Sequence, residues 1–187
     1  MIGFALCGSF CTLSRSVSIL AELKGKGYDV LPIMSEITAE TDTRFGKARD
    51  FIDRIEGLCG HPIIRTIADA EPLGPAVPLD ALLICPCTGN TLAKIANGIT
   101  DTPVCMASKA HLRSDRPLLI TLASNDALSA NLRNIGTLLS RKNVYFTPLK
   151  QDDPASKPHS LVADFSRVPE ALAAALEGRQ VRPLFLE

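Results

Sequence analysis

A cluster of small hydrogen-bonding residues follows an apolar run near the middle of the chain. Residues 81–85 (ALLIC) are typical of a strand buried in a parallel sheet. A helix with one apolar face follows, which Asn90 or Thr91 could cap, and the unpaired N–H groups at such a helix start attract anions. An ordinary strand–helix loop has the same composition, so both interpretations stay open. The candidate cofactor-binding residues here are Pro86, Thr88, Gly89, Asn90 and Thr91.

A second turn suited to an anion follows the first predicted strand, residues 2–7. Gly8 lets the backbone approach a ligand closely, and the hydroxyls of Ser9 and Thr12 can donate to a phosphate. A helix with apolar residues at helical spacing then runs to Leu23. The turn lacks the G-x-G-x-x-G pattern that usually holds the pyrophosphate of a dinucleotide. It therefore favours a ligand with a single terminal phosphate.

Two further strands are predicted to end in polar residues. Ser35 and Thr38 follow a strand at 28–34 and could bind a phosphate or a sugar-alcohol chain, although such hydroxyls are as often simple helix caps. Asn125 follows a strand at 117–123. Because the C-terminal ends of parallel strands share one rim, where open α/β sheets bind ligands, we expect these residues to join the cofactor site.

Three cationic residues, Lys109, His111 and Arg113, stand within five positions. The sequence predicts a strand at 103–106 and a loop after it that carries these residues. Cations on a loop at the sheet edge suit a small-molecule ligand with two carboxylates, and we assign Lys109 and Arg113 to substrate binding. A solvated basic loop is the alternative. No pair of carboxylates and no Ser-His-Asp set is evident, so the catalytic residues stay unknown.

Apolar runs alternate with helical stripes along most of the chain, which predicts one α/β domain over residues 1–187. The expected fold is a doubly wound, three-layer sandwich with a mainly parallel, Rossmann-like sheet. Helices are expected at 48–58, 127–139 and 160–176, with Ser124-Asn125-Asp126 capping the second of these. The polar loop at 151–159 is too long to belong to the core and is a candidate lid or partner contact.

Composition excludes several classes of protein. The chain has 187 residues, of which 46% are hydrophobic and 21% charged, values that argue against disorder. Lysine plus arginine equals aspartate plus glutamate at 20 each, so we expect neither a nucleic-acid partner nor a membrane surface. The N-terminus lacks a basic stretch ahead of its apolar residues, and no apolar run is long enough for a membrane span. We expect a cytoplasmic protein.

Six cysteines are present, and none forms a C-x-x-C pair, so no metal site is expected. Free, buried thiols are the interpretation we favour. Cys11 and Cys87 follow predicted strand ends and are the candidates for a reactive thiol. His61 is the one histidine before the central strand, but its glycine and proline neighbours favour a turn at a helix end.

Several short motifs, in order along nearly the whole chain, resemble known flavin-dependent proteins. Residues 86–91 (PCTGNT) and the ten that follow resemble the P-A-S-A-N-T segment of flavin-dependent cysteine decarboxylases. The longer match resembles the B-subunit family of dipicolinate synthase. It includes residues 41–46 (TDTRFG), 70–75 (AEPLGP), 102–103 (TP), 109–113 (KAHLR), 124–128 (SNDAL) and 151–154 (QDDP).

The resemblance implies a flavoprotein-like fold, bound FMN and a homo-oligomer. It also implies a dehydrogenase-like A subunit as partner, with which the chain would make the spore metabolite dipicolinate from a cyclic dicarboxylate of the lysine pathway. NADP could then bind to the A subunit. Decarboxylases carry a P-A-M-N motif at the positions of residues 104–107 (VCMA), and its asparagine is absent here. The rivals are an FMN-dependent decarboxylase or prenyltransferase relative and a non-catalytic nucleotide-binding partner subunit.

Overall fold

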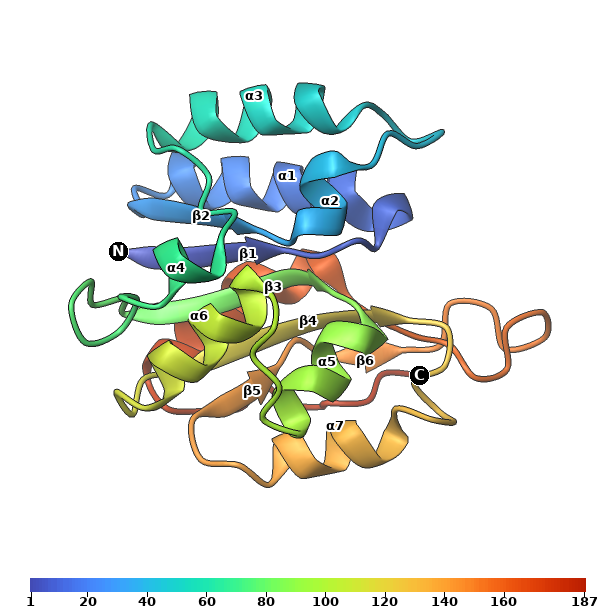
Figure 1. Ribbon diagram of the computed structural model, residues 1–187. Helices are drawn as coiled ribbons and strands as arrows, with labels where there is room; N and C mark the ends of the chain where they lie inside the picture. The colour runs from blue at the N-terminus through green and yellow to red at the C-terminus, as the bar shows by residue number, and fades with distance from the viewer.

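The computed structural model describes residues 1–187 and contains one seven-stranded sheet, in the order β2-β1-β3-β4-β7-β6, with β5 also paired to β4 (Figure 1). The pairs among β1 to β5 are parallel, whereas β7 runs antiparallel to both β4 and β6. The predicted mainly parallel sheet is therefore confirmed. The strands are β1 (Ile2–Leu6), β2 (Val30–Met34), β3 (Ala81–Cys87), β4 (Leu118–Ser124), β5 (Val144–Phe146), β6 (Leu149–Lys150) and β7 (Leu161–Ala163).

Helices cover both faces of this sheet, and each face has its own apolar core. Helices α1, α3 and α8 pack on one face, and α4, α5, α6 and α7 pack on the other. The three-layer sandwich predicted from the sequence is thus confirmed. The helices are α1 (Phe10–Gly25), α2 (Glu36–Glu40), α3 (Ala48–Cys59), α4 (Ile67–Ala70), α5 (Gly89–Ala96), α6 (Pro103–Leu112), α7 (Leu132–Leu139) and α8 (Val168–Leu176), with a 3-10 turn at Phe165–Arg167.

The central strands are apolar throughout because both of their faces are covered. In β1, Phe4 and Leu6 point into the core beneath α1, whereas Ala5 and the following Cys7 point into the core on the other face. This two-residue alternation is the pleat of the strand. Full burial of a side chain such as Phe4 contributes about 1.5–3 kcal/mol to stability.

The strand predicted at 103–106 is wrong: these residues form the first turn of α6. Thr102 caps this helix, since its hydroxyl accepts the Cys105 N–H at 3.2 Å, and Pro103 occupies the first helical position, which proline tolerates. Most of the segment 107–113, predicted to be a loop, continues the same helix, which ends at Leu112 with Arg113 as its C-cap. Its helical period is hard to see in the sequence because much of α6 is buried.

Two other predicted helices are shorter than expected. Residues 160–176 contain strand β7 and a 3-10 turn before α8 begins at Val168, because Asp164 caps the turn by accepting the Ser166 N–H at 3.1 Å. Helix α7 begins at Leu132, not at Ala127, and residues 125–130 form turns. The apolar residues 161–163 have the composition of a helix stripe but pair with β4 and β6.

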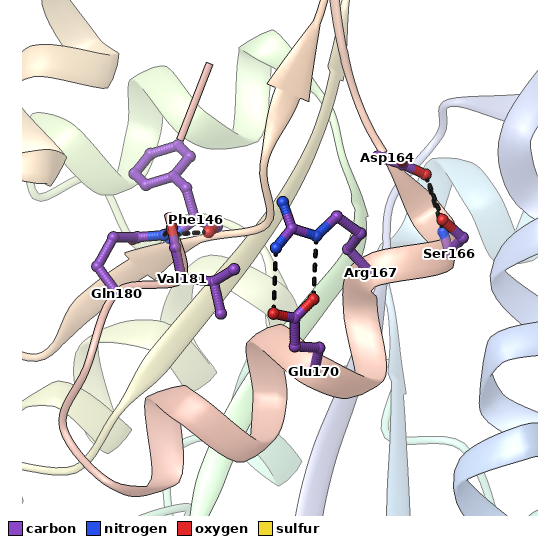
Figure 2. A network of polar contacts seen from close by, with 7 residues as sticks. All are labelled: Phe146, Asp164, Ser166, Arg167, Glu170, Gln180 and Val181. Carbon is purple, nitrogen blue, oxygen red and sulfur yellow. Dashed lines mark hydrogen bonds and ion pairs between the residues drawn. The ribbon is translucent and has the colours of Figure 1, made fainter. Parts of the chain in front are cut away.

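One side chain of the C-terminal segment, that of Gln180, bonds the backbone of β5 (Figure 2). The carboxamide of Gln180 accepts the Phe146 N–H at 2.8 Å and donates to the Phe146 carbonyl at 2.7 Å, and also to the Val181 carbonyl at 3.0 Å. It therefore satisfies backbone groups as a neighbouring strand would. Nearby, Arg167 donates to both carboxylate oxygens of Glu170 at 3.0 and 3.1 Å.

Candidate functional site

A groove of about 460 Å³ lies where β1, β3 and β4 end, and we call it the central groove. Three strand-end turns that are far apart in the sequence meet there, as expected from the shared rim of a parallel sheet. Only one of its lining residues is hydrophobic, so the groove is suited to a polar ligand. The lining residues are Gly8, Ser9, Thr88, Gly89, Asn90, Ala123, Ser124, Asn125 and Asp126.

Two further grooves adjoin the central groove and share residues with it. The α2 groove, of about 370 Å³, shares Gly8, Thr88 and Asn90, and is also lined by Ser35, Glu36, Ile37, Thr91, Lys94 and Thr102. The outer groove, of about 410 Å³, shares Ser9 and residues 123–125, and is also lined by Cys11, Thr12, Arg15, Arg44, Asp152, Lys157, Ser160 and Val162. The three grooves thus lie side by side along the C-terminal rim of the sheet.

The turn after β1 presents Ser9 to the central groove. Ser9 occupies the N-cap position of α1, yet its side chain makes no capping hydrogen bond. Its oxygen instead accepts from the Thr12 hydroxyl at 3.0 Å, a hydroxyl that also lies 3.0 Å from the Ser9 carbonyl. The Ser9 O–H can therefore still donate to a ligand, and Thr12 holds Ser9 in place from behind.

The turn after β3 is organised by Thr88, not by the caps that the sequence suggested. Thr88 caps α5, because its hydroxyl oxygen accepts the Thr91 N–H at 3.3 Å, so Asn90 and Thr91 belong to the first turn of the helix. The Thr88 hydroxyl in turn donates to the Thr91 hydroxyl at 3.2 Å. The side chain of Asn90 is exposed and makes no hydrogen bond within the chain, and the same holds for the side chain of Asn125 after β4. Both carboxamides are therefore free to bind a ligand.

A polar network that was not predicted from the sequence supports the groove from below. Asp126 accepts from the Ser124 hydroxyl and from the Asn131 amide at 2.9 Å, and Asn131 accepts from Asn134 at 2.8 Å. The Ser124 hydroxyl, followed by the Asn131 amide, lowers the pKa of the Asp126 carboxyl and keeps it ionised. The stretch 124–126 was predicted to be a helix cap, a role that the same residue types suit equally well.

Two predicted site residues, Thr38 and Pro86, lie behind the groove surface, and a third, Ser35, is largely buried but reaches it. The hydroxyls of Ser35 and Thr38 are buried and 2.7 Å apart; Ser35 lines the α2 groove, whereas Thr38 lines none of the three grooves. Pro86 is buried, and its carbonyl accepts the Cys7 N–H at 3.1 Å. Thr38 and Pro86 thus position neighbouring residues and do not line the site.

Lys109 and Arg113 are not on a rim loop, contrary to prediction. Lys109 lies on the last turn of α6 and Arg113 is the C-cap of that helix, exposed and 3.6 Å from Glu71. Thr102 at the other end of the helix reaches the α2 groove. At a rise of about 1.5 Å per residue, Arg113 is roughly 16 Å farther along. The buried His111, which bonds the Pro117 carbonyl at 2.9 Å, fixes this end of α6 at the start of β4.

The thiols differ sharply in accessibility. Five cysteines are buried and Cys11 is exposed. Burial raises the pKa of the Cys87 thiol well above its ordinary range and that of Cys7 to about 12, which disfavours thiolate at neutral pH.

His61 lies outside the rim and contacts Asp29 at 3.2 Å, consistent with the helix-end turn. No cluster of three or more metal-ligating side chains is present, and no helix has the length and apolar character to cross a membrane.

The chain is similar to known proteins over its full length. A family model described as Flavoprotein matches residues 1–164. The dipicolinate synthase B subunit of Bacillus subtilis (strain 168) is 42% identical over 186 residues, covering 100% of this chain and 93% of that protein. The crystal structure of the dipicolinate synthase B subunit from Bacillus halodurans C has a TM-score of 0.91 at 41% identity, covering 100% of this chain and 95% of the other. The FMN-dependent cysteine decarboxylase SpaF, at 24% identity, shares the fold with a TM-score of 0.69, covering 94% of each chain.

Proposed function

The chain belongs to the flavoprotein family and, within it, to the group of dipicolinate synthase B subunits, and from this premise we propose that it is an FMN-binding catalytic subunit acting on a cyclic dicarboxylate. Together with a dehydrogenase-like A subunit it would form dipicolinate during sporulation. NADP, where it takes part, would bind the A subunit, because none of the three turns of the central groove has the glycine pattern for a pyrophosphate.

The strongest support is the convergence of three strand-end turns on one polar groove. The Ser9 hydroxyl, which can donate its hydrogen, and the N-terminal N–H groups of α1 suit a phosphate, and Asn90 and Asn125 offer unpaired carboxamides to a ribityl chain. The volume of the central groove lies within the usual range for cofactor sites, about 300–1,000 Å³. The residues present therefore fit the phosphate and ribityl chain of FMN.

The net reaction is loss of water and removal of two hydrogens, which makes the ring aromatic. Bound FMN would supply an acceptor for the two hydrogens. The chain's own residues would bind and orient the cofactor, because Asn90 on α5 and Asn125 after β4 both line the central groove. Because FMN would accept the hydrogens and the chain would bind and orient the reactants, no acid–base pair of side chains is needed at the rim.

A second candidate is a non-catalytic subunit whose rim binds a nucleotide while the A subunit carries out all redox chemistry. The decarboxylase rival is less favoured, because residues 104–107 lack the asparagine of the P-A-M-N motif. Titration of the purified chain with FMN separates the first two candidates. We expect quenching of flavin fluorescence with saturation at one FMN per chain, and absence of binding would favour the non-catalytic subunit.

The location of the phosphate is tested with Ser9→Asp. A carboxylate at this position would repel the phosphate at the same place where α1 presents its positive end, so FMN affinity should fall at least tenfold. The matched control is Ser18→Asp, an exposed position on the same helix whose hydroxyl bonds only the Ser14 carbonyl. Equal FMN affinity in the parent and in Ser9→Asp would show that the phosphate binds elsewhere.

A further inference from the structure

The outer groove gathers positive charge from three segments that are distant in the sequence. Arg15 comes from α1, Arg44 from the segment between α2 and α3, and Lys157 from the loop before β7. One carboxylate, that of Asp152, lines the same groove. Neither of the other two grooves on the rim contains an arginine. The outer groove is therefore the place on the rim where an anion is most favoured.

The two arginines differ from Lys157 in how they are held. Lys157 is neutralised by Asp152, whose carboxylate lies 2.8 Å from its ammonium group. The guanidinium groups of Arg15 and Arg44 have no carboxylate within ion-pair distance and donate no hydrogen bond within the chain. Each guanidinium instead lies over an aromatic ring, Arg15 at 4.9 Å from the centre of Phe165 and Arg44 at 4.8 Å from the centre of Phe45.

The contact with an aromatic ring leaves both guanidinium groups oriented and able to bind a carboxylate. Stacking on a ring engages the flat face of a guanidinium and leaves the N–H groups along its edge free to donate. It also restricts the side chain, so less entropy is lost when an anion binds. The planar fork of an arginine matches the two oxygens of a carboxylate, whereas a lysine offers a point charge.

We propose that the outer groove is the subsite for a carboxylate of the substrate, with Arg15 and Arg44 as its ligands in place of Lys109 and Arg113. The groove shares Ser9 and Asn125 with the central groove, so a ring held there by its carboxylate lies beside the proposed FMN site. This inference rests on the proposed function for the identity of the ligand class, a cyclic dicarboxylate, and the two can fail separately.

The test uses dipicolinate itself, pyridine-2,6-dicarboxylate, as the probe, with the full chain in the presence of FMN. Calorimetric titration should show about a tenfold or greater loss of dipicolinate affinity in Arg15→Met and in Arg44→Gln, the scale expected for losing hydrogen bonds to a charged group. FMN affinity, measured in parallel, should stay within twofold of the parent value. Arg15→Met keeps an apolar stem over Phe165, which protects the fold.

The matched control is Arg141→Ala, which removes an exposed arginine without an ion pair from a groove at the start of β5, away from the rim. It should leave dipicolinate affinity unchanged. Parent-like dipicolinate affinity in both Arg15→Met and Arg44→Gln would overturn the inference, as would a parent that binds no dipicolinate. Loss of FMN together with dipicolinate would also overturn it, since the groove would then hold the cofactor phosphate. Selective loss of dipicolinate in a chain that binds no FMN would uphold it and refute the FMN proposal.

Discussion

At the scale of single residues, Gly89 is a position on the floor of the central groove that has no room for a side chain. A Cβ atom on Gly89 would lie 2.5 Å from the Ser124 hydroxyl, 2.6 Å from the Asn131 amide and 2.8 Å from the Asp126 carboxylate. Contacts this short force their partners to move, and all three partners belong to the network below the central groove. The absence of a side chain at Gly89 thus allows α5 to begin directly above Asp126.

We therefore expect Gly89→Ala to lower the free energy of unfolding by about 1–3 kcal/mol, the usual effect of overpacking, and to weaken FMN binding as the groove floor shifts. The matched control is Gly136→Ala in α7, where no atom lies within 4 Å of the added Cβ. That change should stabilise the chain by roughly 0.5–1 kcal/mol through helix propensity. Urea unfolding and FMN titration of both variants provide the measurements, and equal stabilities would contradict the expected clash.

Residue types alone predicted much of the lining of the central groove, but not which of its atoms are free of partners within the chain. Gly8, Ser9, Thr88, Asn90 and Asn125 were predicted as site residues, and all of them line the central groove. Their common feature is a position just after a strand, which the sequence displays. Asp126 was missed because a carboxylate two residues after a strand has the same appearance whether it caps a helix or supports a site.

At the scale of elements, the sequence predicted the parallel strands and most of the helices that flank them. It failed at α6, where a mainly buried helix has apolar residues on nearly every side and so lacks a clear period. Thr102-Pro103 was the signal that could have corrected this, since a capping threonine followed by proline is typical of a helix start. Because of this error, Lys109 and Arg113 were predicted to lie on a loop at the rim, whereas they lie at the C-terminal end of a helix.

The cap of α6 gives a test at this scale. Removing the hydroxyl in Thr102→Ala leaves the Cys105 N–H without its partner, and the free energy of unfolding should fall by about 1 kcal/mol. Thr102→Ser keeps a capping hydroxyl and should restore most of the loss. Thr137→Ala, whose hydroxyl bonds only the Arg133 carbonyl within α7, should change stability by less than about 0.5 kcal/mol. Urea unfolding followed by circular dichroism would refute the cap if Thr102→Ala matched Thr137→Ala.

At the scale of the whole molecule, the rim is polar where it would receive phosphate and lacks apolar walls for a flavin ring. The central groove has one hydrophobic lining residue, and the α2 groove has only Ile37, whose side chain is 60% exposed. Phe45, at 41% exposure, stands at the edge of the same region, in the segment that also supplies Arg44. Exposed apolar side chains beside an open polar groove are typical of a surface that a partner covers.

We predict that copies of this chain associate through the surface around Ile37 and thereby enclose the flavin ring. Light scattering should give a mass that is a multiple of 20.0 kDa for the parent, and Ile37→Asp should shift the mass toward a single chain with loss of FMN, because a charge in an apolar contact is strongly disfavoured. Leu132→Asp is the matched control, since Leu132 is 49% exposed on α7 and lines none of the rim grooves. A parent chain that runs at 20.0 kDa with FMN bound would show that one copy encloses the cofactor alone.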